Sequence, residues 1–199
     1  MENQSLEVEC PKRVINIFGQ INPEMTYEIL NQIYDIEYFD SQIKATNEDA
    51  ELYPVVVNIM SQGGCCYSCQ AILDGLLSLE APVITRGYGE IQSAAFVLFL
   101  TGDIRLSGKH TTFMTHSLTY NIGEGKLNVQ KQEFDEFTRM NNRILDFISD
   151  KTDIPREYLA ENIDKEIYMD YNEAIQYHVV TDDVSLNAIY DLYYDEENA

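Results

Sequence analysis

The sequence predicts one α/β domain built around a parallel sheet. Apolar runs rich in Val and Ile at residues 13–18, 54–60 and 82–85 alternate with segments whose apolar residues recur at helical spacing. The run at 54–60, P-V-V-V-N-I-M, is almost entirely apolar, as in a strand buried on both faces. With 199 residues and 45% hydrophobic content, the chain is long enough for one real core. The β-α-β-α-β-α order implies right-handed crossovers and a ligand site at the carboxyl ends of the strands.

The first strand and helix are followed by a loop. The run R-V-I-N-I-F at 13–18 predicts a strand that ends at Gly19. Residues 40–52 are polar and acidic and predict a loop. Residues 23–39 between them predict a helix, because apolar side chains recur there at helical spacing: Met25, Ile29, Leu30, Ile33 and Ile36.

Two glycine-bearing turns follow the next two strands. The second strand runs into S-Q-G-G at 61–64, and a helical pattern then continues to Leu79. The third strand ends in glycines at 87 and 89, after which an apolar helical run begins at Ser93. Both turns fall at the carboxyl ends of their strands, where a site is expected.

The second half of the chain adds short strands and a long helix. Residues 103–106 and 111–115 predict strands, 153–155 predict a helix start, and 171–178 predict the last helix. Residues 126–151 predict a long amphipathic helix with this apolar stripe: Phe134, Phe137, Met140, Ile144, Leu145 and Ile148.

Ser93 is a candidate nucleophile and His116 a candidate base. A serine at a strand-to-helix turn lies near the positive end of the helix dipole, and free backbone N–H groups beside it can hold an oxyanion. The alternative is an N-cap serine that opens a buried helix. His116 stands at the end of a predicted strand, where a surface or hydrogen-bonded histidine is the alternative.

The charge balance excludes several functions. Thirteen Lys and Arg against 34 Asp and Glu give a formal net charge of −21, which argues against binding nucleic acid or anionic membrane surfaces. The longest apolar run, Ala94 to Leu100, is too short to span a bilayer, and no charged start precedes an apolar leader segment. We therefore expect a soluble protein.

Three of the four cysteines crowd into G-G-C-C-Y-S-C. The pair Cys66-x-x-Cys69 matches half of a zinc site or a redox couple, but no second Cys/His pair has ligand spacing, so no metal is expected. Small buried thiols on a helix are the preferred interpretation. Together with the missing leader, they favour a reducing cytoplasm.

Five segments in order resemble the proteolytic subunit of the ATP-dependent Clp protease. The resemblance covers about residues 12–183 and points to a divergent member, of the sort that bacteriophages carry as well as bacteria or plastids. The segments are R-V-I-N-I-F-G-Q-I (13–21), V-N-I-M-S-Q-G-G (57–64), the Ser93 turn with A-F-V-L-F-L-T-G, F-M-T-H-S (113–117), and Y-M-D-Y-N-E-A-I-Q-Y-H-V-V-T-D (168–182).

The resemblance implies a serine peptidase without a cofactor. Ser93 and His116 fall on the family's nucleophile and base, and the backbone N–H groups of Gly64 and Ala94 on its oxyanion hole. The family binds extended substrate chains beside the glycine turn, here Gly63 and Gly64, and beside the segment after the histidine. That segment reads Ser117-Leu118 where the family usually has Gln-Pro, and G-E-I-Q-S replaces G-x-A-A-S before the nucleophile.

The acid of the triad has two candidates. The family's aspartate falls on Glu166, a longer carboxylate, and Asp164 two residues earlier is the substitute. The alternative is that Glu166 is only a surface or interface acid.

The resemblance also implies an assembly. The fold would be a repeated β-β-α superhelix with a parallel sheet and a protruding handle helix at about 126–151, inside a peptidase domain at 13–185. An N-terminal arm (1–12) and an acidic tail (186–199) would flank it. Two stacked heptameric rings of one subunit would enclose unfolded polypeptide substrates, supplied by a hexameric ATP-driven unfoldase of the AAA+ class. The chain itself has no G-x-x-x-x-G-K-[ST] nucleotide motif.

Two other functions remain open from the sequence. A catalytically inactive Clp-like subunit that builds or regulates a ring would explain the irregular third triad position and the I-Q-S turn. An acyl-transfer or acyl-CoA-binding enzyme of the related crotonase-type fold would also use paired backbone amides, but Ser93 and His116 both match the peptidase pattern.

Overall fold

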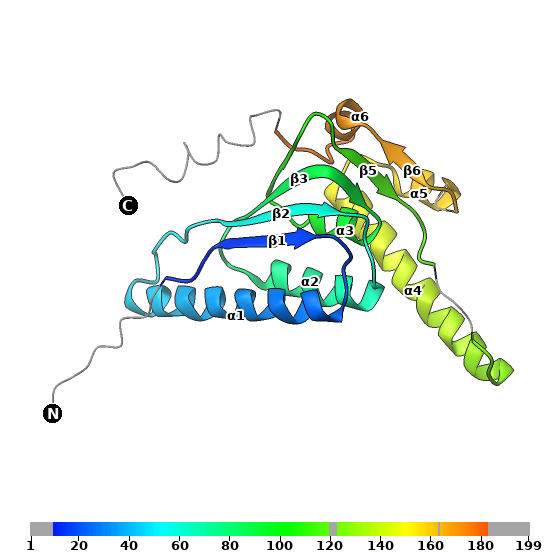
Figure 1. The fold of residues 1–199 in the computed structure, drawn as a ribbon, viewed down its shortest axis with the longest axis horizontal. Coiled ribbons are helices and arrows are strands. Elements are labelled where there is room, and N and C mark those ends of the chain that lie inside the picture. Colours follow the sequence, from blue (N-terminus) through cyan, green and yellow to red (C-terminus); the bar gives the residue numbers. More distant parts are fainter. Residues whose placement is uncertain (1–9, 120–122, 163, 183–199) are drawn as a thin grey trace.

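The computed structural model describes residues 10–119, 123–162 and 164–182. The expected tail at 186–199, and residues 1–9 of the expected arm, lie outside the described residues. Figure 1 shows the arrangement of these elements, in chain order: β1 (Val14–Phe18), α1 (Pro23–Thr46), β2 (Val55–Ser61), α2 (Cys66–Ser78), β3 (Val83–Gln92), α3 (Ala94–Phe99), β4 (Ile104–Ser107), β5 (Thr112–Thr115), α4 (Leu127–Lys151), α5 (Arg156–Asn162), β6 (Ile167–Met169) and α6 (Tyr171–Gln176).

The sheet is parallel except at one edge. Its strands follow the order β1-β2-β3-β5-β6, and β4 also pairs with β3. Among the strands of the described residues, only the β5–β6 pair is antiparallel. The mixed α/β architecture with a mainly parallel sheet confirms the predicted fold class.

Strand β3 is longer than the sequence predicts. We expected a strand at 82–85 that ends in glycine turns at 87 and 89, but β3 continues through both glycines to Gln92. Its first half pairs with β4 and its second half, from Glu90 to Gln92, pairs with β5. Because β5 supplies partners for these backbone groups, the strand passes through residues that would otherwise favour turns.

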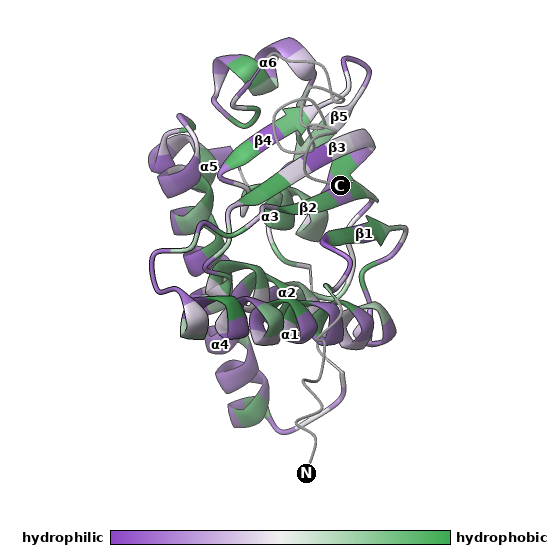
Figure 2. Cartoon of the chain, turned by 90° about the vertical axis from the view of Figure 1, so that its left-hand side faces the viewer, coloured by the Kyte–Doolittle hydropathy of each residue, from purple (hydrophilic) through white to green (hydrophobic). Residues whose placement is uncertain are grey.

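Helices α1 and α2 lie along one side of the β1–β3 strands (Figure 1). The strand residues that alternate toward this side, such as Ile15, Ile17 and Val57, are fully buried and belong to one core cluster with Ile33 and Ile72 of the helices. All six residues of α3 are buried in the same core. Figure 2 shows hydrophobic residues along β1, β2 and β4 and hydrophilic residues along most of α4.

Helix α1 extends into the predicted loop at 40–52, ending at Thr46. The loop prediction was wrong for residues 40–46, because a polar residue there does not face solvent. Asp40 is buried and forms a bidentate pair with Arg13, with Nη1–Oδ1 and Nη2–Oδ2 distances of 2.7 and 2.9 Å. This pair fixes the last turns of α1 beside the start of β1.

Helix α4 projects away from the rest of the molecule at its N-terminal end (Figure 1). Of its predicted apolar stripe, Met140, Leu145 and Ile148 are buried, all in the C-terminal half, whereas Phe134 is 54% exposed. The protruding long helix predicted at 126–151 is therefore present.

The C-terminal end of α4 is fastened to the sheet through Arg105. This buried side chain of β4 donates hydrogen bonds to the carbonyl oxygens of Lys151, His178 and Val179. Burial lowers the pKa of the Arg105 guanidinium. Among the described helices, none combines the length and the apolar character that crossing a membrane requires.

Candidate active site

Ser93 and His116 are hydrogen-bonded to each other. The Oγ atom of Ser93 lies 2.8 Å from Nε2 of His116. The two residues follow β3 and β5, whose register pairs Gln92 with Met114, and the N–H of Ser93 donates to the carbonyl of Met114 at 2.8 Å. Parallel pairing of two strands thus brings together side chains that are 23 positions apart.

The backbone of Ser93 has an unusual conformation. Its φ of 54° and ψ of −121° lie outside the regions that L-residues favour, and His178 is the only other non-glycine with positive φ in the described residues. Such strain persists only where the surroundings enforce it, and a strained strand-to-helix turn is how α/β hydrolases expose a nucleophile. The observation favours a nucleophile turn over a simple N-cap, and Ser93 forms no side-chain cap hydrogen bond.

The glycine turn after β2 packs directly against Ser93. A Cβ on Gly63 would lie 2.8 Å from the Cβ of Ser93 and 3.0 Å from the N atom of Ala94. Gly64 is equally confined on its other side, because a Cβ there would lie 2.1 Å from the carbonyl oxygen of Ile21. Both glycines have positive φ, at 97° and 156°. No other residue type fits this approach of two backbones without displacement.

Hydrogen bonds hold this turn in place. The N–H of Ile21 donates to the carbonyl of Gly63, and the N–H of Cys65 donates to the carbonyl of Ile21, both at 2.9 Å. Ala94 opens α3, and the N–H groups of a first helical turn have no acceptor within the helix. Gly64 and Ala94 therefore belong to two segments that pack against each other at Gly63 and Ser93.

The two candidate acids differ in their position. Strand β6 pairs antiparallel with β5, Thr115 opposite Ile167, so one further step of the register sets His116 opposite Glu166 rather than Asp164. Directly opposite residues share a face of the sheet. In the described residues, however, the Glu166 carboxylate accepts its hydrogen bond from the Tyr168 hydroxyl at 2.9 Å, and neither acid is hydrogen-bonded to His116. This bond to Glu166 raises the pKa of the Tyr168 hydroxyl.

The segment after His116 contacts the long helix. The N–H of Leu118 donates to Oδ1 of Asn141 on α4, at 3.0 Å. Ser117 and Leu118 are both half-buried. The sequence gives no direct signal for this contact, since Asn141 stands only on the polar side of a helical pattern.

Three thiols lie at the start of α2, next to the glycine turn. Cys69 is buried and its Sγ donates to the carbonyl of Ala94 at 3.5 Å. Burial raises the pKa of Cys69 to about 12 and also raises that of Cys66. The N–H of Ser68 lowers the pKa of the half-exposed Cys65, although its sulfur makes no geometric helix cap. All four cysteines are free, and the described residues contain no group of His, Cys, Asp and Glu that could hold a metal ion.

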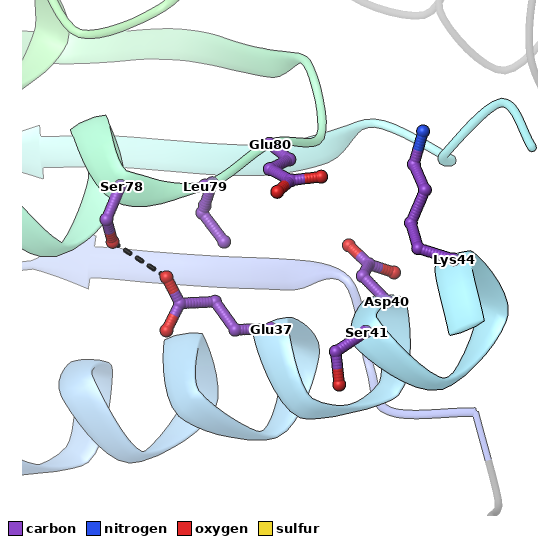
Figure 3. A pocket seen from close by; sticks show the side chains of 7 residues that line it. All are labelled: Glu37, Asp40, Ser41, Lys44, Ser78, Leu79 and Glu80. Atoms are coloured by element: carbon purple, nitrogen blue, oxygen red, sulfur yellow. Dashed lines mark hydrogen bonds between the residues drawn. The ribbon is translucent and has the colours of Figure 1, made fainter. Parts of the chain in front are cut away.

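A cavity of about 280 Å³ is lined by residues of the C-terminal half of α1 and by the end of α2 with the two residues after it (Figure 3). Two of its acidic side chains have partners: Glu37 accepts from the Ser78 hydroxyl at 2.7 Å, and Asp40 binds Arg13. Lys44 and Glu80 complete its charged lining.

The chain belongs to the Clp protease family, whose family model matches residues 4–185. The resemblance of the sequence to the Clp proteolytic subunit is thereby confirmed.

Curated relatives and a solved structure agree with this family. The chain is 25% identical over 171 residues to the ATP-dependent Clp protease proteolytic subunit 2 of Treponema denticola, covering 85% of this chain and 80% of the relative. It is 28% identical to the proteolytic subunit of Pleurastrum terricola, covering 85% and 82%. A mutant of ClpP1 from Listeria monocytogenes has the same fold, with a TM-score of 0.69, 24% identity, and 85% and 89% coverage.

Proposed function

We propose that the chain is a serine endopeptidase subunit that cleaves unfolded polypeptides inside a ring-shaped assembly. The observation that carries the proposal is the 2.8 Å contact between Ser93 Oγ and His116 Nε2, made by a serine with a strained backbone. The imidazole accepts the hydroxyl proton as Ser93 attacks a peptide carbonyl carbon. A tetrahedral intermediate forms, and His116 then protonates the leaving amine. Water, deprotonated by the same imidazole, hydrolyses the acyl-enzyme.

Backbone amides supply the electrostatic part of this mechanism. The carbonyl oxygen gains negative charge in the intermediate, and the N–H groups of Gly64 and Ala94 donate to it. The close packing of Gly63 on the Ser93 turn keeps these donors from rearranging when the charge develops. Removing one such donor typically costs about 10²–10³ in rate.

The Glu166 carboxylate is the proposed orienting acid. The β5–β6 register, continued by one step, supports this role, and the exposed Glu166 side chain would have to leave the Tyr168 hydroxyl to reach the imidazole. Accepting a hydrogen bond from Nδ1–H would keep Nε2 as the proton acceptor that faces Ser93. Asp164 lies outside this register.

The proposed assembly consists of two stacked heptameric rings in the cytoplasm. The projecting N-terminal half of α4 supports it, because Leu127 and Phe134 are 83% and 54% exposed there and a second subunit would cover them. The four free thiols fit a reducing compartment. An ATP-driven unfoldase is the proposed partner, since a closed chamber admits only unfolded chains.

A serine-directed fluorophosphonate probe tests the peptidase proposal. Assembled wild type, sized by light scattering, should be labelled, whereas Ser93→Ala and His116→Ala should not. Ser149→Ala, a half-exposed serine on α4, is the matched control and should be labelled like wild type. Labelling of wild type that survives Ser93→Ala would contradict the assignment of the nucleophile.

A non-catalytic ring subunit is the second candidate function. The hydrogen bond between Tyr168 and Glu166 favours it, because it leaves the described part of the chain with no acid on His116. An assembled wild-type ring that remains unlabelled would make this candidate the preferred one.

A further inference from the structure

A single side chain of α4 contacts the backbone immediately beyond the candidate base. Oδ1 of Asn141 accepts the N–H of Leu118 at 3.0 Å. The two residues lie 23 positions apart, so the contact joins separate parts of the fold. Leu118 is two residues from His116, within the same irregular segment that follows β5.

This contact satisfies a backbone donor that needs a partner. An N–H group that is shielded from water and has no acceptor is unfavourable, and the half-buried Leu118 follows the end of β5, where no strand partner is available. The carboxamide of Asn141 supplies the acceptor. A proline at position 118 would have no N–H to donate. The hydrogen bond to Asn141 therefore depends on a residue other than proline at position 118.

Asn141 is itself held firmly. Met140, the preceding residue on α4, is 1% exposed, and Leu145, one turn further on, is 3% exposed. Arg105 fastens the end of the same helix through the Lys151 carbonyl. The carboxamide therefore transmits the position of a well-anchored part of α4 to the segment that carries the imidazole.

We propose that Asn141 is a positioning residue: by holding the Leu118 N–H, it keeps His116 at hydrogen-bonding distance from Ser93. The inference rests on the proposed peptidase function. It makes α4 part of the catalytic apparatus of its own subunit, so a displacement of this helix changes the alignment of the imidazole. Misplacement of a base by about 1 Å can lower a rate about 10²-fold.

The test compares two substitutions of similar size. Asn141→Leu removes the acceptor, and Asn141→Asp retains an oxygen at the same place. We expect the rate of fluorophosphonate labelling to fall about tenfold in Asn141→Leu, an amount that corresponds to loss of one such hydrogen bond, and to stay near wild type in Asn141→Asp. Asn142→Leu, at the exposed neighbouring asparagine, should label like wild type. Unfolding midpoints of all variants separate positioning from loss of fold.

A double-mutant comparison isolates the pair. In a Leu118→Pro background the N–H is gone, so adding Asn141→Leu should cause no further loss. The proposal is overturned if Asn141→Leu labels at the wild-type rate, if Asn141→Asp falls as far as Asn141→Leu, or if the two losses simply multiply.

Hydrogen exchange distinguishes failure of this inference from failure of the peptidase proposal. If wild type is not labelled at all, the peptidase proposal fails, and exchange of the Leu118 amide tests the contact alone. Faster exchange in Asn141→Leu than in wild type and Asn141→Asp supports the link between α4 and the His116 segment. Equal exchange in the three proteins overturns it.

Discussion

Gly63 and Ser93 are packed so closely that a methyl group on Gly63 would stand 2.8 Å from the Cβ of Ser93. The same methyl group would lie 2.8 Å from the carbonyl oxygen of Gln92. Real Cβ atoms do not approach other atoms this closely, so the two turns could not both keep their positions. The geometry of the Ser93 turn therefore depends on Gly63, which has no side chain to take part in the proposed chemistry.

Gly63→Ala should abolish labelling of Ser93 by the fluorophosphonate probe. The alanine must push the Ser93 turn away or move the glycine turn, and either change separates the hydroxyl from the oxyanion donors, with an expected loss of at least about 10² in rate. Gly19→Ala is the control, because Gly19 also has positive φ, 83°, but has open space around its missing Cβ. If labelling falls equally in both variants, backbone strain alone would explain the effect, and the packing of Gly63 on Ser93 would not.

Glu166→Gln should lower peptide hydrolysis far more than Asp164→Asn. Continuing the β5–β6 register by one step sets Glu166, and not Asp164, opposite His116, so replacing its charge would remove the proposed orienting group, at an expected cost of about 10²–10⁴ in kcat. Asp164→Asn should stay within about twofold of wild type, as expected of an acid that does not touch the histidine. Steady-state hydrolysis of an unstructured peptide measures both. A larger loss in Asp164→Asn would reverse the assignment.

Cys65 should be alkylated before Cys66 and Cys69. Its pKa is lowered by the N–H of Ser68, so at any pH below the ordinary thiol value a larger fraction is thiolate, and its reaction should rise with pH earlier than that of Cys66. Cys69, buried and with a pKa raised to about 12, should react only after unfolding. Iodoacetamide treatment across a pH series, followed by peptide mass spectrometry, gives the order. Preferential loss of Cys69 in the folded protein would contradict the structure.

Alkylation of Cys65 should also lower the proposed peptidase activity, because Cys65 directly follows Gly64 and its N–H anchors the glycine turn to Ile21. Cys65→Ser removes the thiol and should make activity insensitive to the reagent. Continued inhibition of Cys65→Ser would assign the effect to another thiol.

Asp40→Asn should destabilise the fold by about 3–5 kcal/mol, since it leaves the buried Arg13 charge without its counter-ion. Urea unfolding measures the change in free energy. Lys131→Met on α4 breaks an ion pair with Asp135 that is mostly exposed, and should cost no more than about 0.5 kcal/mol. A small effect of Asp40→Asn would mean that solvent reaches Arg13.

The parallel direction of the first three strands could be predicted from the sequence, because buried parallel strands leave a clear apolar pattern, whereas strand β6 and its antiparallel pairing with β5 were not predicted. The run at 54–60 became β2 with a shift of one residue, and the stripe at 126–151 became α4. The extension of α1 past Asp40 could not be predicted, because a buried aspartate looks like a loop residue until its partner Arg13 is known. The length of β3 depends in the same way on pairing with β5.

The candidate site could be predicted from the sequence only at residues that follow a predicted strand or belong to a glycine turn. Ser93 and His116 each follow a strand, and glycines mark the turn at 63–64, so these residues could be named from the sequence; the structure brings Ser93, His116 and Gly63 together. Asn141 leaves no such mark, since its role comes from a contact between distant elements. The bond between Glu166 and Tyr168 could not be predicted either, because two residues that are two positions apart at the start of a strand do not normally signal a hydrogen bond.

At Ser93, the positive φ makes the stability of the fold and the proposed chemistry favour different residues. A glycine would adopt this turn without the strain that a serine carries, so Ser93→Gly should leave the fold intact or make it more stable. A laboratory search for heat-resistant variants would therefore tend to discard the hydroxyl. Serine at this position is unfavourable for the backbone conformation. Its retention would therefore require a selective pressure other than folding.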